Sequence, residues 1–134
     1  MSTILQLRHG LCAALGTIKG LRVVETVPLD PKPPVAVVFL PTVAYDQSFG
    51  RGYAEYAFTV TVIVGGQDQR TKENKISGYM DAAGALSVAA AVYADRTLGG
   101  VASDSRVTDM RGVSALSVEE NTYLAAEFVV TVYA

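Results

Sequence analysis

Side chains that often carry chemistry are scarce in this sequence. Its 134 residues include one cysteine, one histidine and no tryptophan. A single cysteine excludes a disulfide framework within the chain, which favours a reducing compartment. One histidine leaves little room for a Ser-His-acid triad, and one cysteine plus one histidine fall short of the four ligands of a structural zinc site. The usual enzyme and metal sites therefore have few residues to draw on.

Clustered positive charge and long apolar runs are lacking too. The chain has 11 Lys and Arg against 13 Asp and Glu, a formal net charge of −2, and its basic residues are scattered. A groove that grips nucleic acid needs a basic stripe that neutralises phosphates, so specific nucleic-acid binding is not expected. No apolar run has the length of a bilayer-crossing helix, and Gln6, Arg8 and His9 interrupt the N-terminal region where a signal peptide would be apolar. We expect no membrane partner.

What is present is a clear pattern of amphipathic helices. Residues 3–15 place apolar side chains every three or four positions, which predicts an N-terminal helix. Asp68 can cap a second helix that runs to residue 80. Gly84 separates it from a third helix over residues 86–94, which is rich in alanine.

Five segments are typical of strands. The predicted strands are residues 21–27, 35–40, 53–64, 101–110 and 121–133. Residues 35–40 are almost all apolar, so we expect a strand that is buried on both faces, with 42–45 as its continuation on an edge or past a bulge. Residues 53–64 alternate strictly, and we expect their even-numbered side chains on one face. Residues 112–120 are interpreted as a connection, and the proline-rich residues 28–34 as a stiff one.

The order of elements gives the fold class. Strands grouped on both sides of a central helical segment predict an α+β fold. We expect a mainly antiparallel sheet of about five strands, with the N-terminal helix and the two central helices packed on it. Residues 1–134 are expected to form a single domain, since neither a linker nor an internal repeat is visible.

A search for catalytic sets gives little. His9 is interpreted as a surface histidine and Cys12 as a small core residue. Acidic pairs such as Glu119–Glu120 and Asp104 with Asp109 lie in or beside expected loops, where carboxylates are usually solvated. We therefore expect a protein that is not an enzyme and that has no catalytic residue, no metal and no cofactor.

One segment favours a contact with another protein. The tip of the predicted 35–64 hairpin carries Tyr45, Phe49, Arg51 and Tyr53. Tyr and Arg are enriched among the residues that dominate binding energy at interfaces. An exposed Phe at a hairpin tip is unfavourable unless something covers it. We therefore predict an interface at these four residues; the alternative is that Phe49 folds back onto its own domain.

The layout resembles the tail terminator (tail completion) proteins of long-tailed phages, especially those that infect actinobacteria. The resemblance spans most of the chain and rests on the order and spacing of its pieces. These are Ile18-Lys19-Gly20-Leu21-Arg22-Val23, Pro31-Lys32-Pro33-Pro34 before Val35-Ala36-Val37-Val38, Tyr45-Asp46-Gln47-Ser48-Phe49-Gly50-Arg51-Gly52 before a strand that ends Val62-Ile63-Val64-Gly65, Tyr79-Met80-Asp81-Ala82-Ala83-Gly84, and Leu98-Gly99-Gly100 before the last two strands.

This resemblance implies a structural role in the virion. Such proteins form a homo-oligomeric ring, commonly a hexamer, on the head-proximal end of the tail tube. They end tube polymerisation and join the tail to the head, which makes the tail tube protein and a head-tail connector or stopper protein the expected partners. DNA passes through the ring without specific binding. The alternatives are another head-tail junction protein, such as a stopper or adaptor, and a small ligand-binding α+β domain.

Overall fold

The computed structural model describes residues 3–26, 32–45, 54–118 and 121–134. Three α-helices and six strands lie within these ranges. The helices are α1 (Thr3–Leu15), α2 (Gln69–Met80) and α3 (Val88–Ala94), followed by the short 3-10 helix η1 (Leu98–Gly100). The strands are β1 (Arg22–Val24), β2 (Val35–Val38), β3 (Thr42–Ala44), β4 (Glu55–Val64), β5 (Asp104–Val118) and β6 (Asn121–Tyr133).

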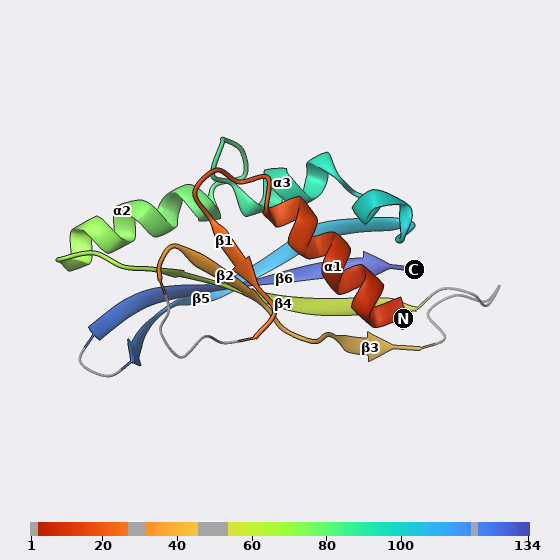
Figure 1. Cartoon of the computed structure of the whole chain (residues 1–134), viewed down its shortest axis with the longest axis horizontal. Coiled ribbons are helices and arrows are strands. Elements are labelled where there is room, and N and C mark those ends of the chain that lie inside the picture. Colours follow the sequence, from red (N-terminus) through yellow and green to blue (C-terminus); the bar gives the residue numbers. More distant parts are fainter. Residues whose placement is uncertain (1–2, 27–31, 46–53, 119–120) are drawn as a thin grey trace.

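One twisted sheet contains all the described strands. Its order is β1-β2-β4-β6-β5, and β3 pairs with β4 on the same side as β2 (Figure 1). The β1/β2 pair is parallel, and the other pairs are antiparallel. The C-terminal strand β6 therefore lies between β4 and β5. The expected α+β fold with a mainly antiparallel sheet is confirmed.

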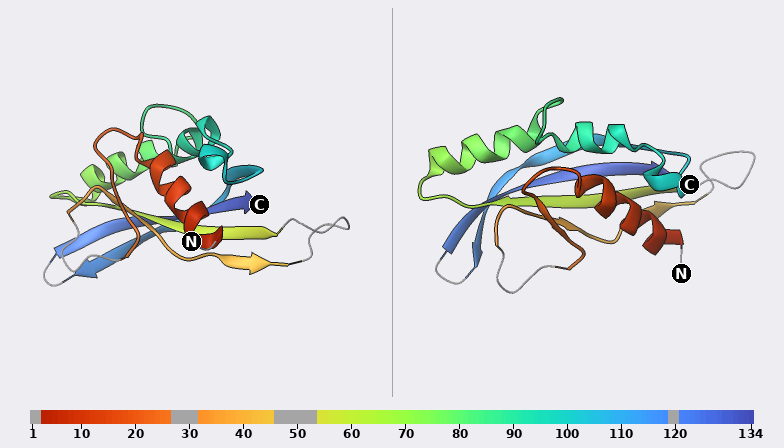
Figure 2. Two further views of the ribbon diagram at one scale, coloured as in Figure 1. Left: turned by 45° about the vertical axis from the view of Figure 1, so that its right-hand side comes forward. Right: turned by 45° about the horizontal axis from the view of Figure 1, so that its top comes forward.

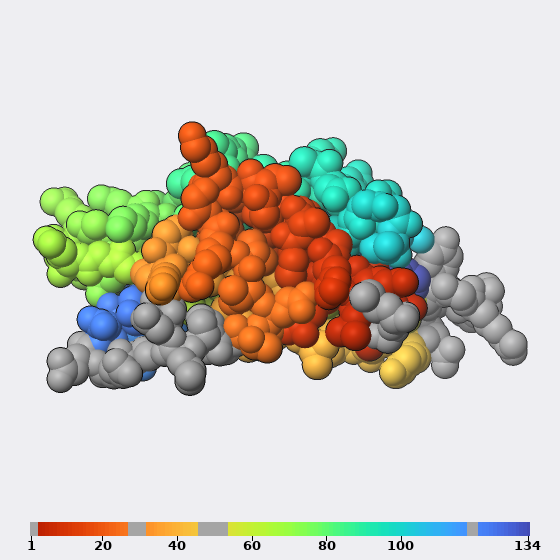
Figure 3. Space-filling model, viewed as in Figure 1, coloured from red at the N-terminus to blue at the C-terminus, as the bar shows by residue number. Residues whose placement is uncertain are grey.

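The helices cover one face of this sheet. Figure 2 shows α2 and α3 following one another along the sheet, with α1 crossing beside them. In the space-filling view α1 fits between α3 and the β1–β2 side (Figure 3). The alternating side chains of β4 and β6 point into this layer, as their period of two predicts. The buried set includes Phe58, Val60, Val62, Val64, Leu124, Ala126, Phe128, Val130 and Val132, together with Leu7, Leu11 and Leu15 of α1.

Polar contacts attach α1 to the strands and cap the starts of α2 and α3. The Arg8 guanidinium donates from Nε to the Val38 carbonyl oxygen at 2.9 Å and from a second nitrogen to the Glu25 carbonyl oxygen, which ties α1 to the chain after β1 and to β2. Asp68 caps α2 as predicted, because its carboxylate accepts the Thr71 N–H at 2.7 Å. Ser87 caps α3 in the same way, accepting from the Ala90 N–H at 3.0 Å.

The opposite face of the sheet is covered by none of the described helices. Its side chains are mostly half-buried, and several are small or polar, such as Ala57, Thr59 and Thr61 of β4. A second, smaller apolar cluster lies on this open face, made of Val35, Val37, Ile63 and Ala125. The sheet thus has a covered face that carries the main core and an open face with one local apolar region.

Two sequence-based expectations about strands are wrong. The strand predicted over residues 35–40 ends at Val38, and Phe39 and Leu40 are exposed. Between the Val38–Val60 and Thr42–Ala57 pairs this segment advances four positions against three on β4, so the strand is interrupted by one extra residue. The connection predicted over 112–120 is strand up to Val118, because β5 pairs with β6 as far as the Val118–Asn121 pair. Long-range pairing, which a local pattern does not contain, imposes this extension.

Candidate assembly interface

Of the four predicted interface residues, Tyr45 can be placed. It follows β3 directly, and 74% of its surface is exposed. Phe49, Arg51 and Tyr53 lie outside the described residues, so their predicted role in an interface stays a prediction.

Tyr45 belongs to a longer exposed apolar segment. We call residues 39–45, Phe-Leu-Pro-Thr-Val-Ala-Tyr, the apolar border, because they include β3, which lies at the edge of the described sheet beside β4, and contain no charge. Leu40 is 61% exposed, and Phe39 is exposed as well. Large apolar side chains gathered on a surface mark contact sites more often than single ones do. Sequence reasoning missed Phe39 and Leu40 because it assigned both to a buried strand.

The open face is hollowed next to this border. A shallow depression of about 240 Å³ extends from β2 across to β5. Its lining is largely apolar, with Glu127 and a few hydroxyl groups among its polar side chains, and it consists of Val37, Phe39, Thr61, Ile63, Ser114, Ala115, Leu116, Ala125 and Glu127. Phe39 thus takes part both in the apolar border and in the depression, which makes the two surfaces continuous.

Two further depressions meet near Lys75 of α2. One of about 230 Å³ is mainly apolar and is lined by Pro34, Val64, Gly65, Lys75, Tyr79 and Leu86. The other, of about 390 Å³, is wide open and shares Gly65 and Lys75 with the first. The Lys75 ammonium donates to the Gly65 carbonyl oxygen at 2.8 Å. The first depression is smaller than the roughly 300–1,000 Å³ of typical ligand sites. Its one charged side chain, Lys75, is hydrogen-bonded to the backbone.

Cys12 and His9 share a carboxylate that the sequence did not point to. His9 Nε2 lies 3.1 Å from Glu25 Oε1, and Cys12 Sγ lies 4.0 Å from the same oxygen. Burial raises the pKa of the Cys12 thiol to about 11, and the Glu25 charge adds to the shift. A thiol with this pKa is protonated near neutral pH and is a poor nucleophile. Glu25 is 13 residues from Cys12 in the chain, and no local spacing would have linked them.

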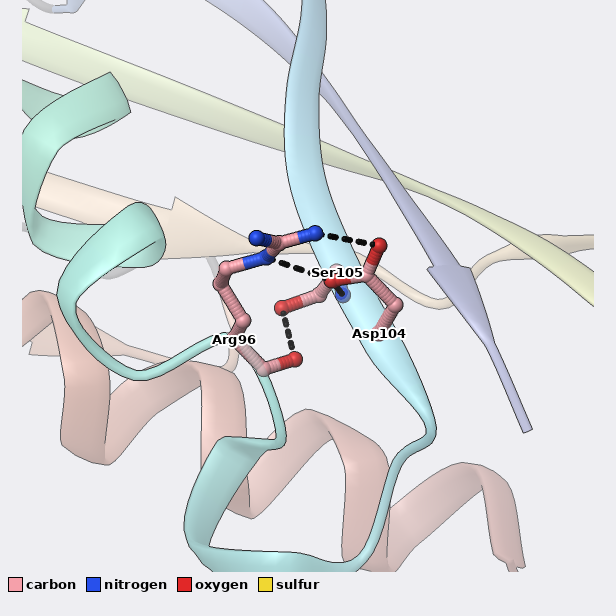
Figure 4. Close-up of polar contacts among 3 residues, drawn as sticks. All are labelled: Arg96, Asp104 and Ser105. Carbon is pink, nitrogen blue, oxygen red and sulfur yellow. Dashed lines mark hydrogen bonds and ion pairs between the residues drawn. The ribbon is translucent and has the colours of Figure 1, made fainter.

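A group of polar contacts lies at the start of β5. Arg96 donates to both carboxylate oxygens of Asp104 at 2.7 and 2.9 Å, and the Ser105 hydroxyl donates to the Arg96 carbonyl oxygen at 2.8 Å (Figure 4). The hydrogen bond from Arg96 lowers the pKa of Asp104, and the same contact raises the pKa of Arg96. The Arg96 guanidinium also lies 5.3 Å from the centre of the exposed Tyr93 ring. Asp104, expected to be a solvated carboxylate in or beside a loop, is the first residue of β5 and forms an exposed ion pair with Arg96.

Neither metal-site geometry nor a membrane-crossing helix is found where the chain is described. Among those residues, no three His, Cys, Asp or Glu side chains are grouped as metal ligands would be. None of the described helices combines the length and the apolar character that crossing a bilayer requires.

No protein-family model matches the sequence, and none of the curated proteins is similar to it. Among solved structures, a chain from a structure titled "Virion of native gene transfer agent (GTA) particle" is 19% identical, with 99% of this chain and 92% of that chain covered. The TM-score of this match is 0.38, too low to carry an argument about function.

Proposed function

We propose that this chain is a structural virion protein, a tail terminator that forms a ring on the head-proximal end of a phage tail tube. In this role it ends tube polymerisation and joins the tail to the head while letting the genome pass. The proposal rests on the sequence resemblance and on one structural observation, the exposed apolar border of residues 39–45, which includes β3. A surface of this kind is costly in water and is expected to be covered in an assembly.

The remaining features agree with assembly in place of catalysis. Cys12 is held as a protonated thiol, and Asp104 is used in an ion pair with Arg96. The chain has a slight negative net charge, which would not retain DNA that moves through a central hole. The partners proposed from the resemblance are further copies of this chain, the tail tube protein and a head-tail connector or stopper protein.

The direct test is the oligomeric state of the purified protein. Native mass spectrometry should give a closed oligomer, which we propose to be a hexamer, and negative-stain electron micrographs should show rings with a central hole. A strict monomer at assembly concentrations, and in virions, would contradict the proposal. Cryo-electron microscopy of the virion separates a terminator from a stopper or adaptor, because the terminator lies directly on the last ring of the tube.

The predicted residues allow a second test. Tyr45→Ala, Phe49→Ala, Arg51→Ala and Tyr53→Ala are expected to weaken ring formation and tail attachment while leaving the free energy of unfolding of the monomer nearly unchanged. Tyr93→Ala is a matched control, since Tyr93 is also highly exposed, at 68%, but lies on α3 away from the apolar border. Normal assembly of the Tyr45 and Phe49 variants would remove the hairpin tip from the interface.

One observation favours the ligand-binding alternative, the apolar depression next to Lys75. A metabolite that bound there would raise the melting temperature by mass action. A thermal-shift screen against small metabolites that gives no shift, with rings present in the same sample, would leave the structural role as the sole candidate.

A further inference from the structure

The two halves of β5 differ in how they protect the edge of the sheet. β5 borders the sheet and pairs only with β6 among the described strands. Its first half carries alternating charges, and two irregularities in register fall between Val107 and Asp109 and between Met110 and Gly112. Charged side chains and bulges are the usual means by which an edge strand avoids pairing with another chain. The charges are Asp104, Arg106, Asp109 and Arg111.

The second half of β5 has none of this protection. Residues 112–118 read Gly-Val-Ser-Ala-Leu-Ser-Val, with no charge and no proline, and their pairing with β6 is regular. Val113 is 40% exposed, and Ser114 and Ala115 are exposed too. A long, uncharged edge of this kind is a template for a further strand.

The opposite side of the sheet offers a second uncharged edge. β3, which lies within the apolar border, pairs only with β4 among the described strands. The other strand on that side, β1, is less suited because its edge carries the exposed Arg22, and the next residue after the strand, Glu25, is engaged by His9 and Arg8. Within the described part of the chain, the sheet therefore presents two different uncharged edges, one on each side.

We propose that β5 of one copy, at residues 112–114 in its uncharged half, pairs with β3 of the next copy, so that the sheets of neighbouring subunits join edge to edge. This inference rests on the proposed ring. A ring needs a head-to-tail contact between two different patches, whereas pairing of two β5 edges with each other would use one patch twice and leave the apolar border exposed. The occupant of the β5 edge is thus a second copy of this chain.

The strand directions allow this junction. β5 runs antiparallel to β6, β6 antiparallel to β4, and β4 antiparallel to β3. Copies that stand side by side in the same orientation therefore bring β5 and β3 together in antiparallel fashion, which is the sense of most pairs in this sheet. The helices of all copies then lie on the same side of the joined sheet.

Side-chain alternation selects a register. Val113 and Val62 both pair with Ala126 of β6, so Val113 lies at the level of Val62 and points to the covered face. Val43 pairs with Tyr56 and points to the same face. Pairing Val43 with Val113 keeps both on that face, whereas a shift by one residue would place them on opposite faces. The same register brings Tyr45 close to Arg111, a suitable pair for a cation–π contact.

This register also requires a stagger between copies. Tyr56 and Val62 are six positions apart on β4, which corresponds to a shift of roughly 20 Å along the strands. Each copy contributes four strands from β5 to β3, so the junction repeats about every 19 Å across the strands. A shift of this size over that width corresponds to a tilt of about 45° between the strands and the ring axis, close to the roughly 35–45° that closed barrels adopt. A staggered junction is therefore compatible with a closed ring.

Disulfide trapping tests the junction. In a Cys12→Ala background, the double variant Val43→Cys/Val113→Cys should give a ladder of covalent oligomers up to the closed ring after mild oxidation, and each single variant should stay monomeric on a denaturing gel. Val43→Cys/Thr108→Cys is the control, because Thr108 lies in the protected half of β5. A covalent dimer from Val113→Cys alone, or trapping by Val23→Cys/Val113→Cys in β1 instead, would overturn the proposal.

Micrographs of the same samples separate this inference from the proposed function. Rings without trapping in the double variant would overturn the edge junction and leave the ring intact. Trapped open chains without rings would support the junction and contradict the ring, and the absence of both would overturn both.

Val113→Lys should reduce the ring fraction at least tenfold, whereas Val101→Lys, at a site that is 41% exposed and lies outside the strands, should leave it unchanged. Equal ring fractions in these two variants would also overturn the junction.

Discussion

The two faces of the sheet are made by the same strands but have different tasks. On the covered face, β4 and β6 contribute Val and Phe side chains that are almost fully buried, such as Phe58 and Val130. On the open face, the intervening positions carry Thr59, Thr61 and Glu127, which are half-buried or exposed. The alternation of a strand therefore separates the residues that hold the monomer together from those available for contact, and substitutions on the two faces should have separable effects.

The largest expected difference between the two faces is in the free energy of unfolding, and it concerns Phe58. Phe58→Ala should lower the free energy of unfolding by about 3–5 kcal/mol, since it leaves a cavity in the main core. Its neighbour on the open face, Thr59→Ala, should cost about 1 kcal/mol or less. Urea denaturation of both variants measures the difference. Equal losses would show that the open face contributes to the core as much as the covered face does.

The Cys12 thiol reports how well the covered side excludes water. With a pKa of about 11 in place of 9.0, its thiolate fraction at pH 8 should be about a hundredfold lower than in the unfolded chain. Alkylation by iodoacetamide should be slower by a similar factor, and its rate should rise steadily as the pH approaches 11. The urea-unfolded protein is the control. A rate at pH 8 equal to that of the unfolded chain would contradict the raised pKa.

A smaller effect is expected at the corner between α2 and α3. The buried Ser87 hydroxyl accepts from the Ala90 N–H and donates to the Asp81 carbonyl oxygen, so Ser87→Ala removes a cap and leaves a carbonyl without its donor. The free energy of unfolding should fall by about 1–2 kcal/mol. Ser114→Ala, on the open side of β5, should change it by about 0.5 kcal/mol or less. Thermal denaturation followed by circular dichroism compares the two.

The smallest effect is the pH dependence due to Asp104. Its pKa is lowered in the folded state by Arg96, so its contribution to stability is present above the unfolded pKa and is lost as the pH falls through the folded pKa. Between about pH 5 and pH 2 the melting temperature of the parent protein should therefore fall more steeply than that of Asp104→Asn. Asp109→Asn serves as the control. Parallel curves for the parent and Asp104→Asn would contradict this assignment.

Strong local patterns made much of the fold predictable. The bounds of α1 and β6 agree with the helix over 3–15 and the strand over 121–133, because their apolar side chains repeat with one clear period. The second half of β5 was missed because Gly112 and the small residues after it carry a weak pattern, and pairing with β6 decides their structure. The parallel β1/β2 pair likewise depends on tertiary contacts.

The candidate interface was predictable only in part. Tyr45 was chosen for its residue type and is exposed in the structure. The edge of β5 escaped notice because its distinguishing property is the lack of charge, which matters only once the strand is known to lie at the border of the sheet. Glu25 was missed for a similar reason, since its closeness to His9 and Cys12 arises from the packing of α1 beside β1.

The central place of β6 has a consequence for biosynthesis. This strand, residues 121–133, is made last among the described elements, yet it lies between β4 and β5. While the ribosome is still translating the residues before it, β4 lacks its longest neighbour and β5 has none among the strands already made. The described sheet can therefore be completed only after β6 has been translated, and until then the chain carries unpaired strands that are prone to aggregate. Pairing between subunits through β5 has to follow insertion of β6, because β5 is held in the sheet by β6.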